Sequence, residues 1–167
     1  SADCEFCIRA DTMKRIEGLI DVIKLCVRNA EQLTGAKADI SWGEISAERY
    51  PNRPMCQAFK DNMATLGIEM KWPDPKAQYG SSDIGNVSIK IPAIHDYLSI
   101  TDDKTIRAHT KEYADAAKSE EAQEICLKGA KGLAMTGYDI LSSDEFQAEI
   151  RRFHEQQIPD FYKKKKS

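Results

Sequence analysis

Residues 11–35 read DTMKRIEGLIDVIKLCVRNAEQLTG, and this stretch decides the fold of the first third of the chain. Its apolar residues recur every three or four positions, which is the spacing of an amphipathic helix. They are Ile16, Leu19, Ile20, Ile23, Val27 and Ala30. Asp11 or Thr12 is suited to cap the start of the helix, and Gly35 is suited to end it. The stretch predicts one long helix.

Segments with a two-residue period lie on both sides of this helix. Before it, the apolar residues of 4–10 alternate with polar ones, and residues 36–42 repeat the pattern after it. Alternation of this kind predicts half-buried strands, so the first fifty residues are expected to form a β-α-β unit. Two strands and one helix bury too little apolar surface to fold alone. We therefore expect neighbouring strands from another part of the protein or from a partner.

A second unit is expected after the proline-rich break at residues 50–54. Pro54 suits the first turn of a helix that ends near Gly67, and Ser119 begins another helix. Ser142, with Glu145 three residues later, predicts a capping box that opens the last helix. Residues 87–91 fit either a strand or a short helix that leads into one. Three glycines of the helix after Ser119 predict close packing against a sheet; they are Gly129, Gly132 and Gly137.

The composition narrows the range of partners and locations. Among 167 residues, 24 Lys and Arg oppose 27 Asp and Glu, for a net charge of -3. This balance argues against nucleic acid or an anionic membrane as the main partner, and the terminal lysine run is interpreted as a solvated tail. No apolar run approaches the roughly 18 residues that span a bilayer. An odd set of five widely spaced cysteines fits a reducing compartment, so we expect a soluble, cytoplasmic protein.

The Cys4-Glu5-Phe6-Cys7 motif has the spacing of a zinc or redox pair. On the predicted strand, however, Cys4 and Cys7 point to opposite faces, which favours a structural role. A small redox or zinc protein that uses these two thiols is the weaker hypothesis.

The run from Gly80 through Ser81, Ser82 and Asp83 is the first candidate binding element. Such a run can direct backbone N–H groups and hydroxyls at a carboxylate or at developing negative charge. The same composition is also typical of an ordinary turn. Both interpretations stay open on the residues alone.

Three histidines and one arginine complete the set of candidates. His109 lies among polar residues in a predicted loop, where a metal ligand is plausible, although a catalytic zinc needs three or more ligands. His95 is either structural or a support for the site, and His154 is interpreted as a surface residue. Arg9 is either a solvated charge or a clamp for a substrate carboxylate.

Several segments together resemble one family, the zinc metallopeptidases that include the aminoacylases and carboxypeptidases. The closest branch is that of p-aminobenzoyl-glutamate hydrolase and β-alanyl-lysine dipeptidase. The resemblance covers nearly the whole chain in consistent order. Its segments are residues 2–10 with the helix after them, 80–88, 92–97, 109–113 and 129–136.

The resemblance implies an α/β fold that is part of a two-domain amidohydrolase. Residues 1–50 would be the end of an α+β lid and dimerisation domain, and residues 51–167 the returning part of the catalytic domain. The chain would then correspond to the last two-fifths of such an enzyme, which is expected to form a homodimer through the lid.

The resemblance also implies a reaction, in which two zinc ions activate a water that hydrolyses the amide bond of an N-acyl amino acid or dipeptide. The expected substrates are p-aminobenzoyl-glutamate-like compounds or β-alanyl dipeptides. His109 would be a metal ligand, residues 80–83 the wall for the substrate carboxylate, and Arg9 its clamp. The general base and the other ligands have no match here, so this segment alone is expected to be inactive. The alternative is a non-catalytic dimerisation or interaction module without the metal site.

Overall fold

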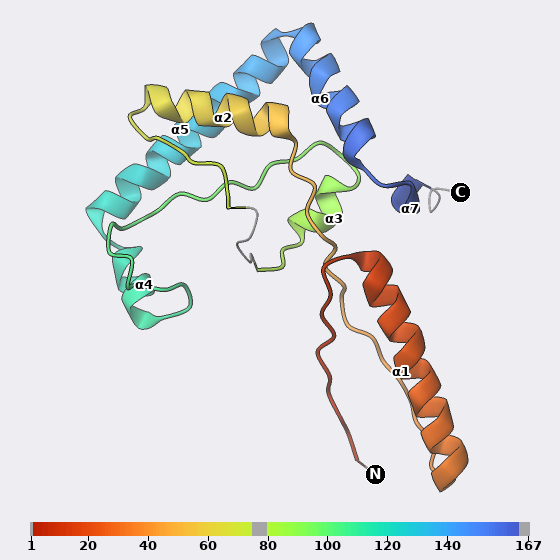
Figure 1. The fold of residues 1–167 in the computed structure, drawn as a ribbon. Helices are drawn as coiled ribbons and strands as arrows, with labels where there is room; N and C mark the ends of the chain where they lie inside the picture. Colours follow the sequence, from red (N-terminus) through yellow and green to blue (C-terminus); the bar gives the residue numbers. More distant parts are fainter. Residues whose placement is uncertain (1, 75–79, 164–167) are drawn as a thin grey trace.

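The computed structural model describes residues 2–74 and 80–163, and this part of the chain is mainly helical (Figure 1). Its helices are α1 (Met13–Thr34), α2 (Arg53–Thr65), α3 (Ile84–Ser88), α4 (Lys111–Ala116), α5 (Glu120–Ser142), α6 (Asp144–Gln157) and α7 (Asp160–Lys163). Among the described residues the β-pairing is confined to one parallel bridge, between Pro51 and Ala93.

The long N-terminal helix is confirmed as α1. The Thr12 side chain accepts a hydrogen bond from the backbone N–H of Arg15, as an N-cap does. Gly35 ends the helix in the left-handed conformation at a φ of 73°, where a residue without a side chain is favoured. The sequence therefore located both ends of this helix correctly.

The two predicted strands of the β-α-β unit do not form. Residues 2–10 and 36–50 run as extended chain alongside α1 without a ladder (Figure 1). Most of their side chains are exposed, and Phe6 is 80% exposed. A strand needs a neighbour to satisfy its N–H and C=O groups, and no described segment supplies one. The expected α/β class is thus only loosely matched by this helical structure.

The core lies where α2, α5 and α6 pack against one another. Met63 of α2 is fully buried and Phe59 nearly so. A Cβ on Gly132 of α5 would lie only 2.4 Å from the sulfur of Met63, and one on Gly129 would lie 2.7 Å from Leu98. The predicted close packing at these glycines is therefore present, but it serves a helix and a loop instead of a sheet. A Cβ on Gly137 would meet no atom of another part of the structure within 4 Å.

The start of the last long helix is one residue later than predicted. Because α5 continues through Ser142, the next residue, Ser143, becomes the cap of α6 and accepts from the backbone N–H of Phe146 at 3.1 Å. The helix expected around Pro54 is confirmed as α2, with Asn52 as its cap. The short helix α3 covers residues 84–88, so only the first two of the residues 87–91 are helical; residues 89–91 form a turn, and no strand follows among the described residues.

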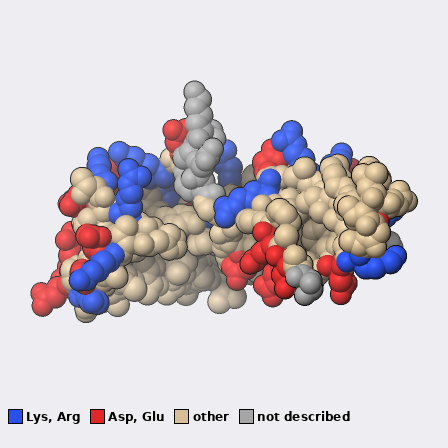
Figure 2. All heavy atoms as spheres, turned by 90° about the horizontal axis from the view of Figure 1, so that it is seen from below, with Lys and Arg blue, Asp and Glu red and all other residues tan. Residues whose placement is uncertain are grey.

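The surface carries charges of both signs, interspersed with broad uncharged areas on the face shown in Figure 2. Some of the uncharged area is apolar. On α5, the side chains of Leu127, Tyr138 and Leu141 are largely exposed. None of the described helices has the length and apolar character needed to cross a membrane.

Candidate functional site

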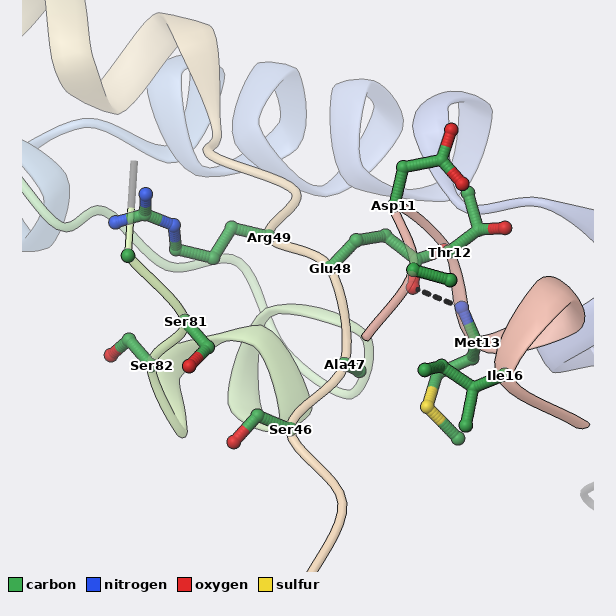
Figure 3. A pocket seen from close by; sticks show the side chains of 12 residues that line it. Asp11, Thr12, Met13, Ile16, Ser46, Ala47, Glu48, Arg49, Ser81 and Ser82 are labelled. Atoms are coloured by element: carbon green, nitrogen blue, oxygen red, sulfur yellow. Dashed lines mark hydrogen bonds between the residues drawn. The ribbon is translucent and has the colours of Figure 1, made fainter. Parts of the chain in front are cut away.

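A small cavity of about 120 Å³ lies between the start of α1, the segment 45–50 that leads to α2, and residues 80–82 (Figure 3). We call the segment 45–50 the linker. A typical small-molecule pocket has roughly 300 Å³ or more, so this cavity is too small to enclose a whole ligand of that size. Its walls are formed by Ala10, Asp11, Thr12, Met13, Ile16, Ser46, Ala47, Glu48, Arg49, Gly80, Ser81 and Ser82.

Side chains of α3 hydrogen-bond to backbone N–H and C=O groups of the linker, as the backbone of a neighbouring strand would in a sheet. The Oδ1 atom of Asn86 accepts from the Ala47 amide at 2.8 Å, and its Nδ2 donates to the Ile45 carbonyl at 3.1 Å. Ser88 Oγ accepts from the Tyr50 amide at 3.0 Å. Asn86 and Ser88, which follow the run of residues 80–83, therefore bind backbone of the same chain.

Gly85 lets α3 approach the linker this closely. A Cβ built there would lie 1.9 Å from the backbone oxygen of Ala47, far inside van der Waals contact. The other side of α3 is held by α6, where His154 Nε2 lies 2.8 Å from the Ser88 carbonyl oxygen. His154 is thus half-buried and hydrogen-bonded, and its interpretation as a surface residue was wrong.

Arg49 supplies a positive charge to the cavity. Figure 3 shows its side chain extending toward the side where Ser81 and Ser82 lie. Its Nη1 donates to the hydroxyl of Tyr97 at 2.9 Å, and the Tyr97 ring stacks on His95 with centroids 4.9 Å apart. A ring nitrogen of His95 lies 3.5 Å from Ser82 Oγ, beyond a strong hydrogen bond. His95 therefore supports the Arg49 side of the cavity through Tyr97.

Glu48 connects three separate segments at the other end of the cavity. Its carboxylate accepts from the hydroxyls of Tyr50 and Tyr162, both at 2.7 Å, and from the Met13 amide at 2.9 Å. Burial by itself would raise the pKa of Glu48, but the hydrogen bonds from Tyr162, Tyr50 and Met13 favour the charged form and together lower it. The linker, α1 and α7 are thereby joined at one carboxylate.

Acid is expected to weaken this junction. Because the pKa of Glu48 is lower in the folded protein than its ordinary 4.5, its stabilisation is present above the ordinary pKa and is lost as the pH falls through the lowered one. Glu48→Gln should lower stability at neutral pH and flatten the acid limb of a stability profile measured from pH 7 to pH 3. An acid limb of unchanged slope in this variant would contradict the role of Glu48.

The structure brings together only part of the predicted site. Gly80, Ser81 and Ser82 line the cavity, while Asp83 is the exposed residue before α3. Arg9 is exposed and does not line the cavity, although the next residue does. Its role as a clamp stays a prediction. The sequence pointed to neither Arg49 nor Glu48, because the linker has no periodic pattern and only the folded chain shows their neighbours.

The residues described here do not build a metal site by themselves. His109 is exposed, has a φ of 66° and precedes Thr110, the cap of α4. No group of three or more possible metal ligands occurs in the described ranges 2–74 and 80–163. A zinc site built from His109 therefore needs ligands beyond these residues. Cys4 and Cys7 are free and exposed.

Comparison with known proteins relates the chain to peptidases. No protein-family model matches it. It is 36% identical over 150 residues to the Xaa-Arg dipeptidase of Mus musculus, covering 86% of this chain and 34% of the relative. For the Xaa-Arg dipeptidase of Homo sapiens the identity is 36% over 146 residues, covering 86% and 33%. The chain thus spans about a third of the length of these relatives. Over most of its residues, this chain is homologous to part of the dipeptidases.

Proposed function

We propose that the chain is part of a metal-dependent dipeptidase that cleaves dipeptides with a basic C-terminal residue. The observation that carries the substrate class is the distribution of charge around the cavity. Arg49 and the hydroxyls of Ser81 and Ser82 suit a carboxylate, whereas Glu48 contributes negative charge (Figure 3). The other lining carboxylate, that of Asp11, is paired with Arg15 at 2.9 Å. An amino acid with a carboxylate and a cationic side chain is complementary to Arg49 and Glu48.

The same charges distinguish between the two substrate types that the sequence suggested. The side-chain carboxylate of a p-aminobenzoyl-glutamate-like substrate would meet the negative charge of Glu48, and like charges brought together are unfavourable. A lysine or arginine side chain would be attracted to it. The relatives are named for a C-terminal arginine, which agrees with this preference.

His109 is proposed as one zinc ligand of this dipeptidase. Its imidazole is exposed, and the residue directly precedes Thr110, the cap of α4. The remaining ligands and the general base are expected from the part of the natural protein that these residues do not include. The bound metal would supply an activated water for amide hydrolysis.

The proposal is tested on the natural polypeptide at its full length. We expect hydrolysis of arginine- and lysine-terminated dipeptides at a kcat/KM roughly tenfold or more above that for p-aminobenzoyl-glutamate. His109→Ala should lose bound zinc and lower kcat roughly a thousandfold, since a catalytic metal contributes several kcal/mol. The control is Lys111→Ala, an exposed neighbour on α4.

Two results would contradict these assignments. Full zinc content and normal kinetics in His109→Ala would exclude that residue as a ligand. A zinc-free natural protein without hydrolysis of any dipeptide would instead favour the non-catalytic interaction module. No contact among the described residues favours that module at present.

A further inference from the structure

Two of the three segments that form the cavity walls are attached to α3. One wall is the linker, which contributes Ser46, Ala47 and other residues, and the opposite wall is residues 80–82. Residues 80–82 lead directly into α3, so the start of that helix fixes this wall covalently. The linker is attached to the same helix without a covalent link, by hydrogen bonds and by the close contact of Gly85 with Ala47. The separation of these two walls is therefore set by how α3 binds the linker.

Asn86 makes the central part of this attachment. Its amide group binds a backbone N–H and a backbone C=O of the linker at once, at Ala47 and Ile45. Asn86 itself does not line the cavity. Its influence on a ligand must therefore pass through the backbone that it holds. Ala47, one of its two partners, is a buried wall residue.

Arg49 lies two residues beyond Ala47, so the position of its guanidinium depends on the same attachment. On one side of Arg49, Asn86 fixes Ala47, and on the other side Ser88 fixes Tyr50. With both flanking amides held, the Arg49 side chain leaves the backbone at a fixed point facing residues 80–82. Because the Asn86 amide group makes two hydrogen bonds, it fixes the orientation of the linker backbone as well as its distance from α3.

We propose that Asn86 is a positioning residue, which sets the separation of the two cavity walls and thereby the binding of the substrate's C-terminal residue. The part that concerns substrate rests on the dipeptidase function proposed above. If the attachment is lost, the walls separate and Arg49 no longer faces the carboxylate. Binding is then weakened more than the chemical step, which takes place at the metal.

The test combines amide hydrogen exchange with kinetics on the full-length natural protein. In Asn86→Ala, which loses both hydrogen bonds, we expect exchange of the residue 45–50 amides to become roughly tenfold faster. The KM for an arginine-terminated dipeptide should rise roughly tenfold while kcat changes less than about twofold. Asn86→Asp keeps the acceptor for Ala47 and loses the donor to Ile45, so intermediate values are expected.

Asn62 provides a matched control. Its Nδ2 makes two side-chain hydrogen bonds, to Thr136 and Asp139 of α5, away from the cavity. Asn62→Ala should lower stability without changing KM or the exchange of residues 45–50.

The two readouts separate the possible outcomes. Unchanged exchange of residues 45–50 in Asn86→Ala would overturn the positioning role, and so would faster exchange with an unchanged KM. If the wild-type protein hydrolyses no dipeptide, the proposed function fails, and exchange of residues 45–50 together with 80–82 decides whether Asn86 holds the walls.

Discussion

Gly85→Ala is expected to detach the linker from α3. The new methyl group would lie 1.9 Å from the Ala47 oxygen and 2.7 Å from its carbonyl carbon, and both are backbone atoms that no side-chain rotation can move away. Overpacking of this kind costs about 1–3 kcal/mol. If α3 moves away instead, the hydrogen bonds that Asn86 and Ser88 form with the linker are lost, and each loss costs about 1 kcal/mol. We expect a loss of roughly 3 kcal/mol in unfolding free energy.

Urea denaturation measures this loss, and Gly137→Ala is the control. Gly137 also lies within a helix, but a Cβ there meets nothing within 4 Å. Alanine at that position should stabilise the protein by about 0.5–1 kcal/mol, because glycine is the poorer helix former. If the two variants had equal stability, the close contact between α3 and the linker would not exist in solution.

Asn52→Ala is the second substitution with a large expected effect. Asn52 is fully buried, and its side chain has two partners. Oδ1 accepts from the Met55 amide at 3.3 Å as the cap of α2, and Nδ2 donates to the Ile150 carbonyl of α6 at 3.0 Å. Loss of a cap costs about 0.5–2 kcal/mol, and loss of the buried hydrogen bond to the Ile150 carbonyl, which keeps its partner within α6, costs about 0.5–1.5 kcal/mol. We expect a total loss of about 1–3 kcal/mol.

Two variants separate the contributions to this loss. Thr110→Ala removes an exposed cap, that of α4, and should cost only about 1 kcal/mol. Asn52→Ser keeps a cap acceptor but is too short to reach α6, so its cost should lie between those of Thr110→Ala and Asn52→Ala. The measurement is the denaturation midpoint at pH 7. Equal losses in Asn52→Ala and Thr110→Ala would show that the bond to Ile150 contributes nothing.

The helices could be predicted because their signals are local. The cap and the glycine stop of α1 lie within the helix's own sequence, as do the serine before α5 and the proline of α2. The prediction of the two strands was wrong because a strand depends on a partner far away in the sequence. A two-residue alternation gives a segment the tendency to be extended, but the ladder requires another strand, and no described segment provides one.

The candidate site also has a part that the sequence predicted and a part that only the structure shows. Residues 80–82 were found from their composition, and the structure places them in the cavity wall. Residues 85–88, which follow shortly after, have a similar composition of glycine and small polar residues but bind the linker instead. Composition shows which groups can donate and accept hydrogen bonds, and it does not show whether the partner is a ligand or backbone forty residues away.

The sequence by itself determined the long helices, the caps of α1 and α5 and the relation to dipeptidases, because each depends on neighbouring residues or on residue identity along the chain. Only the tertiary structure decided that Arg49 and Glu48 line the cavity and that Asn86 holds its wall. These contacts join residues about 40 to 110 positions apart in the chain. Their geometry arises from the packing of α3, α6 and α7 around the linker. No local sequence pattern predicts this packing.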